Sequence, residues 1–236
     1  RTPEATWHTM RDTLTESVTF LGLVTGTLAK IGCDIALMMQ TEVGEVYEPF
    51  LPGRGSSSTM PQKRNPHLSQ DVMAYAAQIR TMVPLAMESV MTEHEANRQT
   101  SLMMRYAERE VCTLMGDTLE RVRLLAEGLV LKPERMRANL DLTDGLIMAE
   151  PMMLALGEYV GRQEAHDIVY DAAQEAAVGD KTFIELLSAD KRVTGHLSTG
   201  QIEKLLDPTA YTGLCAKMAS EQADRARKLA AELSQT

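Results

Sequence analysis

The residue types best suited to catalysis are concentrated between residues 52 and 66. This serine-rich segment reads Pro-Gly-Arg-Gly-Ser-Ser-Ser-Thr-Met-Pro-Gln-Lys-Arg-Asn-Pro, so hydroxyl groups and three cations lie close together in the chain. Glycine and serine supply little apolar surface and much backbone entropy, which predicts a loop. Asn65 and Pro66 at its end predict an N-cap followed by proline at the first helical position. Such a loop could close over a small anion at the helix N-terminus, although its composition suits a surface linker equally well.

Long helices are predicted on both sides of the serine-rich segment. Between Thr6 and Val46, apolar residues recur every three or four positions, which indicates a helix that faces other helices along its length. About forty residues at ~1.5 Å each would span roughly 60 Å, which is too long for a compact globule and favours an extended bundle shared between subunits. Three glycines in this helix are expected at close helix–helix contacts: Gly22, Gly26 and Gly32.

The chain after the serine-rich segment has helical periodicity as well. It predicts helices over residues 68–95, with a kink at Pro84, and over residues 102–131. We expect a central bundle domain at 1–130 and a smaller C-terminal helical domain at 131–236. Capping boxes are expected in the second domain, at Thr182 to Glu185 and at Ser198 to Gln201. No strand is predicted, so the expected fold class is all-α.

Charge and cysteine usage exclude several classes of protein. The 236 residues carry a formal net charge of −9, which argues against nonspecific nucleic-acid binding. Cys33, Cys112 and Cys215 lie far apart without metal-ligand spacing, so we expect buried free thiols in a reducing compartment. The sequence has no signal peptide and no uninterrupted apolar run of about eighteen residues. It therefore predicts a cytoplasmic protein that does not bind membranes.

From Ser57 onward the serine-rich segment reads Ser-Ser-Thr-Met-Pro-Gln-Lys-Arg-Asn-Pro. This run resembles, residue for residue, the Gly-Ser-Ser-x-Met-Pro-x-Lys-x-Asn-Pro signature of the fumarase/aspartase superfamily, except that Ser56 takes the place of the glycine. The long helices on either side agree with the long central bundle of that superfamily. The resemblance covers its central and C-terminal helical parts. The family's N-terminal domain, which brings histidines to the site, is expected to be absent from this chain.

Within the superfamily, the flanking sequence is most similar to the carboxymuconate cycloisomerases, with adenylosuccinate lyases next. The stretches that carry this similarity are residues 7–12, 40–45, 136–141, 145–150 and 206–211. The resemblance implies an enzyme that interconverts 3-carboxy-cis,cis-muconate and its lactone, by adding a carboxylate to an alkene with transfer of a Cα proton. Two alternatives remain open: a fumarate-releasing lyase such as adenylosuccinate lyase, and a non-catalytic relative that keeps the bundle for structural use.

The resemblance also implies roles within the serine-rich segment. Ser57 would exchange the Cα proton, helped by the charge of Lys63 and the amide of Asn65, which would hold a substrate carboxylate. Further substrate contacts are expected from Ser56, Ser58, Thr59 and Met60. No metal or organic cofactor is required by this chemistry. The expected partners are a small di- or tricarboxylate substrate and further copies of the chain, in a homotetramer whose active sites are shared between subunits.

Three residues outside the serine-rich segment are also candidates. Gln70 stands where many lyases of the superfamily carry a glutamate that pairs with a catalytic histidine; an amide can orient a histidine but cannot ionise. His94 lies between two glutamates and could reach a site or form a surface ion pair. Arg11, near the start of the first predicted helix, could contact substrate or have a structural role.

Overall fold

The computed structural model describes residues 8–50, 59–60 and 62–235. The described chain is mostly helical, which confirms the all-α prediction. It divides into two compact units, residues 1–136 (unit 1) and residues 137–236 (unit 2).

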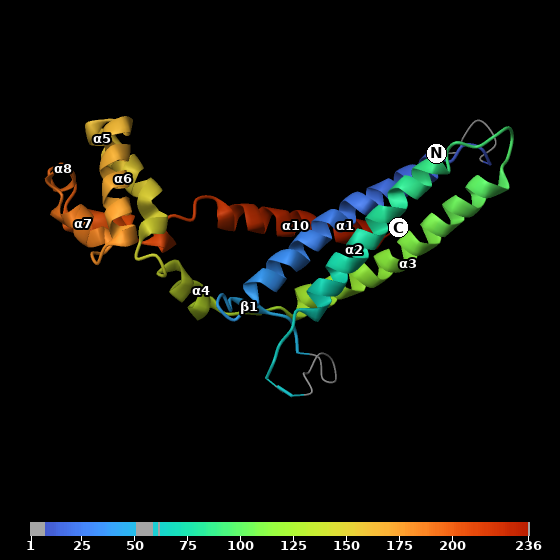
Figure 1. The fold of residues 1–236 in the computed structure, drawn as a ribbon, viewed down its shortest axis with the longest axis horizontal. Helices are drawn as coiled ribbons and strands as arrows, with labels where there is room; N and C mark the ends of the chain where they lie inside the picture. Colours follow the sequence, from blue (N-terminus) through green and yellow to red (C-terminus); the bar gives the residue numbers. More distant parts are fainter. Residues whose placement is uncertain (1–7, 51–58, 61, 236) are drawn as a thin grey trace. The chain divides into compact units, whose positions relative to one another are not determined.

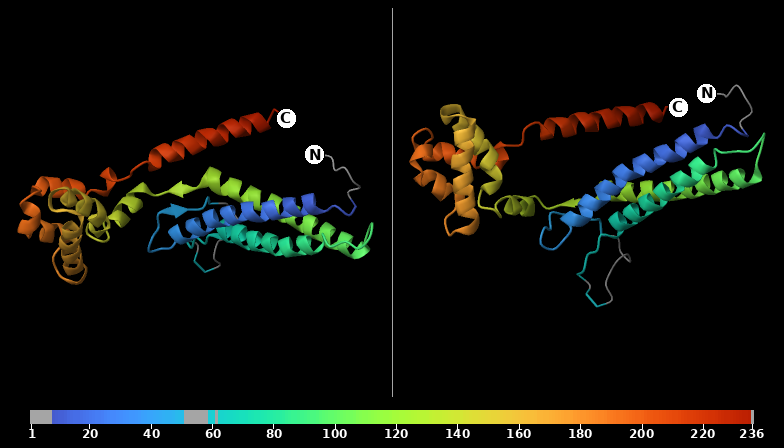
Figure 2. Two further views of the ribbon diagram at one scale, coloured as in Figure 1. Left: turned by 90° about the horizontal axis from the view of Figure 1, so that it is seen from above. Right: turned by 45° about the horizontal axis from the view of Figure 1, so that its top comes forward.

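Unit 1 is a bundle of three long helices that lie side by side (Figures 1 and 2). They are α1 (Asp12–Met38), α2 (His67–Glu88), which continues through Pro84, and α3 (Arg98–Gly128). The apolar stripes of the three helices face one another and form the core, whose most buried members include Val18, Ile79, Val111, Val72 and Leu125. The start of α1 lies beside the end of α2, as a hydrogen bond of 3.1 Å from the Thr15 hydroxyl to the Ala86 carbonyl shows. The chain therefore leaves α1 and enters α2 at the opposite end of the bundle.

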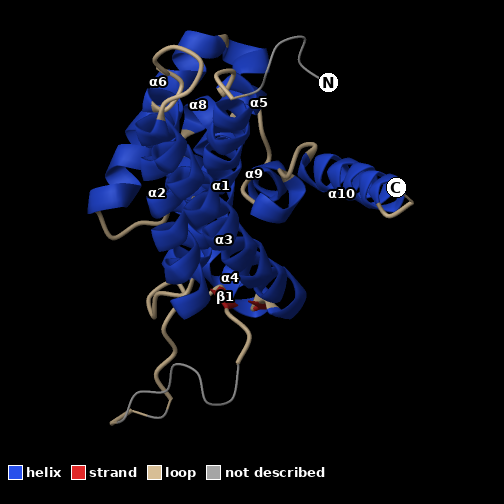
Figure 3. Cartoon of the chain, turned by 90° about the vertical axis from the view of Figure 1, so that its right-hand side faces the viewer, coloured by secondary structure: helices blue, strands red, loops and turns tan. Residues whose placement is uncertain are grey.

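The first helix is shorter than the sequence predicts. It ends at Met38, and a turn follows in which Gly44 has a positive φ of 62°. The next residues form strand β1 (Val46–Tyr47), which pairs antiparallel with β2 (Val130–Leu131) (Figure 3). The predictions of a helix to Val46 and of no strand are therefore wrong. Val46 is only 1% exposed, so its apolar side chain serves the core from a strand that ties the chain after α1 to the chain after α3.

Small residues allow close contacts within unit 1. A Cβ at Gly22 would lie 3.0 Å from the Val83 side chain, and one at Gly32 would lie 3.0 Å from the Ser69 carbonyl oxygen. These two positions confirm the predicted helix–helix contacts, whereas Gly26 has no atom within 4 Å of such a Cβ. The tightest contact is at the end of α3, where a Cβ at Gly128 would lie 2.5 Å from the Cβ of Pro49.

Substituting Gly128 with alanine is expected to destabilise the protein by about 1–3 kcal/mol, because the added methyl overlaps the rigid ring of Pro49. The matched control is Gly116→Ala in the same helix, where a Cβ meets nothing within 4 Å. Alanine has the higher helix propensity, so the control is expected to gain up to about 1 kcal/mol. Thermal unfolding of both variants checks the prediction, and equal shifts of Tm would contradict it.

Unit 2 begins within α4 (Pro133–Leu140) and is built mainly from short helices. They are η1 (Leu146–Met148), α5 (Ala149–Val160), α6 (Arg162–Val178), α7 (Phe183–Ala189), α8 (Lys191–Thr194), α9 (Thr199–Leu205), η2 (Pro208–Ala210) and α10 (Cys215–Leu233). Residues from five of these helices, α5 to α9, form its core, including Met152, Ile168, Phe183, Val193 and Ile202. Both predicted capping boxes are present, at the starts of α7 and α9. No described residue of α10 is buried.

The start of α8 depends on an ionised carboxylate. Asp190 accepts a hydrogen bond from the Arg192 backbone N–H at 2.8 Å and pairs with its guanidinium at 2.8 Å. The guanidinium lowers the pKa of Asp190 below its usual value of 3.8. Because the folded-state pKa lies below the unfolded one, the stabilisation is present above about pH 3.8 and is lost as the pH falls through the folded value.

The variant Asp190→Asn is therefore expected to lower stability near pH 7 by about 0.5–1 kcal/mol. The difference in Tm between wild type and variant should shrink as the pH is lowered below 3.8. The control Asp224→Asn removes an exposed ion pair with Arg227 and should change Tm little at either pH. A difference for Asp190→Asn that stays constant down to pH 2 would contradict the assignment.

Two features of the helix surfaces differ from the expectations. Cys33, Cys112 and Cys215 are free thiols as predicted, but all three are exposed, so the prediction that they are buried is wrong. Of the helices described, α1 alone is long and apolar enough to cross a membrane, by length and composition only. Core helices meet the same two criteria, and α1 packs along α2 and α3.

Candidate functional site

Of the candidate residues that the structure describes, most lie at one end of unit 1. Ser56, Ser57 and Ser58 lie outside the described residues. The rest of the serine-rich segment's candidates, Thr59, Met60, Lys63 and Asn65, lead into α2, and Gln70 lies in its first turns.

Four of these residues line a hollow of about 700 Å³, which we call the Lys63 hollow. Its lining comes from the last turn of α1, the turn after it, the serine-rich segment and the start of α2. The polar lining residues are Gln40, Gln62, Lys63, Arg64, Asn65 and Gln70, with Thr41, Tyr47 and Cys33. The described lining thus offers two cations and four amides but no carboxylate. This balance favours an anionic ligand, because the cations attract it and the amides can donate hydrogen bonds to it.

The first turn of α2 is capped in a way the sequence did not predict. Pro66, not Asn65, occupies the N-cap position, and it makes no side-chain cap bond. The predicted N-cap at Asn65, with proline at the first helical position, is therefore wrong. The carboxylate of Glu48 caps the helix instead, accepting from the backbone N–H groups of Leu68 and Ser69 at 3.0 and 2.7 Å.

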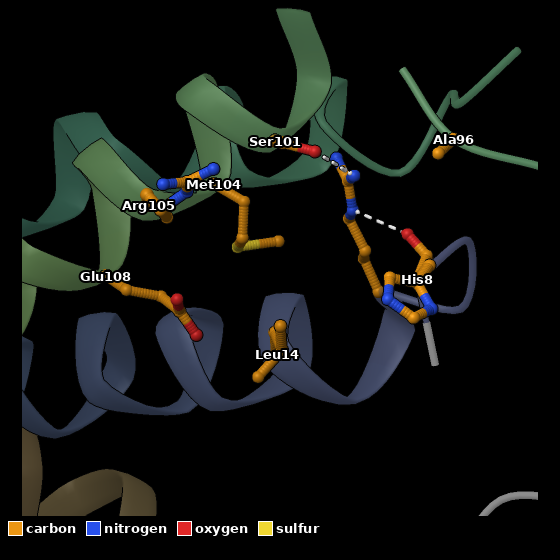
Figure 4. A pocket seen from close by; sticks show the side chains of 8 residues that line it. His8, Leu14, Ala96, Ser101, Met104, Arg105 and Glu108 are labelled. Carbon is orange, nitrogen blue, oxygen red and sulfur yellow. Dashed lines mark hydrogen bonds between the residues drawn. The ribbon is translucent and has the colours of Figure 1, made fainter. Parts of the chain in front are cut away.

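A second pocket lies at the opposite end of unit 1 (Figure 4). This Arg11 pocket has a volume of about 310 Å³ and is lined by Arg11 with His8, Leu14, Ala96, Ser101, Met104, Arg105 and Glu108. Arg11 is only 6% exposed. Its guanidinium donates to the Ser101 hydroxyl at 2.6 Å and to the carbonyls of Ser89 and His8 at 3.3 Å each.

The partners of Arg11 are all neutral in the part of the chain that the structure describes. No carboxylate there lies within ion-pair distance of its guanidinium. A buried cation without an opposite charge is costly, and an anionic ligand in the pocket would offset that cost. Arg105 from α3 adds a second cation to the same lining and Glu108 adds one carboxylate, so the described lining has an excess of positive charge.

His94 does not line either pocket. It is exposed, has a positive φ of 51°, and lies in the connection between α2 and α3, two residues before Ala96 of the Arg11 pocket. It forms no ion pair with any described residue, so the surface ion pair considered for it is not found there.

The two pockets cannot meet within one chain. Helix α1 has 27 residues and runs from the Arg11 pocket toward the Lys63 hollow, so at ~1.5 Å per residue roughly 40 Å separates them. The structure thus brings Lys63, Asn65 and Gln70 together but leaves Arg11 and His94 at the far end. Sequence reasoning missed Ser101, Arg105 and Glu108, whose spacing of four and three residues places them on one face of α3.

Two protein-family descriptions match this chain. Residues 2–81 match the family described as "Lyase", and residues 145–222 match "Adenylosuccinate lyase C-terminus". The first match includes α1, the serine-rich segment and most of α2, and the second lies within unit 2.

Curated relatives align with nearly the whole chain. A 3-carboxy-cis,cis-muconate cycloisomerase from Pseudomonas aeruginosa is 41% identical over 89% of this chain and 46% of its own length. The chain belongs to the fumarase/aspartase family. Trans-aconitate decarboxylase 1 from Mycosarcoma maydis, 40% identical over 91% of this chain and 43% of its own length, shows that similar sequences carry different activities.

A solved structure supports the family's fold for this chain. The 3-carboxy-cis,cis-muconate lactonizing enzyme from Pseudomonas putida superposes with a TM-score of 0.81 and 38% identity, over 90% of this chain and 47% of that one. The chain spans about half the length of the curated relatives that it matches.

Proposed function

We propose that the protein containing this chain is an enzyme that acts on a small di- or tricarboxylate. The observation that carries the proposal is the Lys63 hollow, whose described lining has two cations, four amides and no carboxylate, next to the serine-rich segment. The specific reaction that we propose is the interconversion of 3-carboxy-cis,cis-muconate and its lactone. It is supported by the similarity to cycloisomerases from Pseudomonas, at 41% and 39% identity.

In the lactone-forming direction, a carboxylate of the substrate attacks its own alkene and forms a new C–O bond. The electron pair of the alkene moves toward a neighbouring carboxylate, and Ser57 delivers a proton to the carbon that becomes Cα. Lys63 stabilises the negative charge that develops on that carboxylate through its own positive charge, and Asn65 does so through the N–H donors of its amide. Ser57 regains a proton from solvent before the next turnover, and in the reverse direction it accepts the Cα proton, so the step needs no cofactor.

The proposed active site is completed by another copy of the chain. The Lys63 hollow and the Arg11 pocket are both suited to anions, yet roughly 40 Å separates them in one chain. Helix α1 between them exposes large apolar residues, including Phe20, Leu23, Ile31 and Leu37. If the same helices of other copies cover this face, it becomes buried, and the Lys63 end of one chain can lie next to the Arg11 end of another. We therefore propose a homotetramer with shared sites.

Two other activities are favoured by specific observations. The match of residues 145–222 to the C-terminus of adenylosuccinate lyases favours a lyase that releases fumarate. The similarity to trans-aconitate decarboxylase 1 favours an unsaturated tricarboxylate substrate. A non-catalytic relative is the remaining alternative, and the intact Ser57, Lys63 and Asn65 speak against it.

A direct assay separates these alternatives. The full-length protein is incubated with 3-carboxy-cis,cis-muconate, adenylosuccinate and trans-aconitate in parallel, and ultraviolet absorbance and carbon dioxide release are followed. We expect turnover of 3-carboxy-cis,cis-muconate. Turnover of only one of the other substrates would replace the proposed reaction, and a well-folded protein that converts none of them would favour the non-catalytic alternative.

A further inference from the structure

Glu48 is a buried carboxylate that lies in the chain shortly before the serine-rich segment. It is 7% exposed and directly follows strand β1. Its two oxygens accept from the N–H groups of Leu68 and Ser69, at 3.0 and 2.7 Å. These donors occupy the second and third positions of α2, where backbone N–H groups have no partner inside the helix. The negative charge also lies at the helix end that favours it.

The capping by Glu48 has a consequence for Asn65. Asparagine is among the preferred N-cap residues, and Asn65 lies just before the helix. Its side chain nevertheless makes no hydrogen bond to any residue that the structure describes, and it lines the Lys63 hollow. Because the N–H groups of Leu68 and Ser69 already donate to Glu48, the amide oxygen of Asn65 does not accept a capping hydrogen bond from them. It stays available to a ligand in the hollow.

Glu48 also joins the chain before the serine-rich segment to the chain after it. It lies four residues before Pro52, where the segment begins, and it caps the first turn of α2, which follows the segment. Pro49, the next residue, packs against Gly128 at the end of α3. Glu48, Pro49 and the first turn of α2 are thereby fixed to the bundle on the two sides of the segment.

We propose that Glu48 is a positioning residue of the active site, which caps α2 so that Asn65 and Lys63 remain in the lining of the hollow. The proposal rests on the proposed function of the hollow. Glu48 is not part of the described lining of the hollow, and its two oxygens accept from backbone N–H groups of α2, so it is placed to act through its neighbours and not on the reacting atoms. Its effect on the reaction passes through Asn65 and Lys63.

The test compares Glu48→Gln with wild type in the full-length protein. Glutamine keeps one acceptor oxygen but turns an N–H₂ group toward the other backbone donor, so Asn65 can compete for the helix N-terminus. We expect kcat to fall by about ten- to a hundredfold at a temperature where the variant is fully folded. Hydrogen exchange should become faster at Leu68, Ser69 and residues 62–65.

The matched control is Glu185→Gln. Glu185 likewise accepts from a backbone N–H at a helix start, that of Thr182 at 2.8 Å, but it lies in unit 2. This variant should lower Tm without lowering kcat. A kcat for Glu48→Gln within twofold of wild type would overturn the proposal, and so would a loss of kcat equal in the two variants.

A double variant tests the link to Asn65. Asn65→Ala should cost less in kcat when Glu48 is already glutamine, because the two changes disturb the same amide. Fully independent effects would overturn the proposal. If wild type turns over no carboxylate, the proposed function fails by itself, and hydrogen exchange decides the role of Glu48. Faster exchange confined to residues 62–69 supports that role, and unchanged exchange overturns it.

Discussion

Replacing Ser57 with alanine is expected to lower kcat by about 10²–10⁴-fold, the range typical of a positioned proton-transfer group. The proposed reaction moves one proton at Cα, and alanine has no group that can carry it. The change removes a single hydroxyl, so Tm and oligomeric state should stay at their wild-type values. Steady-state kinetics with 3-carboxy-cis,cis-muconate, together with thermal unfolding, measure both quantities.

The control for this experiment is Ser17→Ala. The Ser17 hydroxyl is exposed and only donates to the Thr13 carbonyl within α1. Its loss should leave kcat unchanged. Near-wild-type turnover by Ser57→Ala would remove Ser57 from the proton transfer, whatever the substrate proves to be.

Replacing Arg11 with lysine is expected to lower kcat/KM by about a hundredfold, which corresponds to roughly 2.7 kcal/mol. Lysine keeps the positive charge but loses the planar fork that donates to Ser101 and Ser89 while leaving further N–H groups for a ligand. Because Arg11 is buried, water cannot replace the hydrogen bonds that the shorter ammonium group no longer reaches. Kinetics with the proposed substrate measure the loss.

Arg109→Lys is the matched control for Arg11→Lys. Arg109 lies one turn beyond Arg105 in α3, is exposed, and pairs with its neighbour Glu110. Its replacement should leave kcat/KM within about twofold of wild type. If Arg11→Lys also stays within that range while both proteins are folded, the Arg11 pocket does not bind the substrate.

The helices were predictable from sequence because their signals are local. Apolar residues at steps of three and four identified the three long helices, and the Thr182–Glu185 and Ser198–Gln201 pairs identified two helix starts. The ends of the first helix were not predictable in this way. Val46 continues the apolar periodicity, but its pairing with Leu131 depends on a contact between segments far apart in the chain.

The candidate site was predictable only where a local motif marks it. Lys63 and Asn65 stand in a recognisable run, and the structure places both in one hollow. The cap at Glu48 was missed because its donors lie 20 and 21 residues further along the chain. The Arg11 pocket was missed as a unit for the same reason, since Arg11 and Ser101 are 90 residues apart.

We propose that the Lys63 end of one chain and the Arg11 end of another form one active site. The decisive test is co-expression of Ser57→Ala and Arg11→Lys chains with different affinity tags, followed by purification through both tags. Some sites in such mixed oligomers combine an intact Ser57 with an intact Arg11 from different chains. We predict that the mixed protein regains much more turnover than either variant alone. Mixed oligomers that form but stay as inactive as their parents would contradict the shared site.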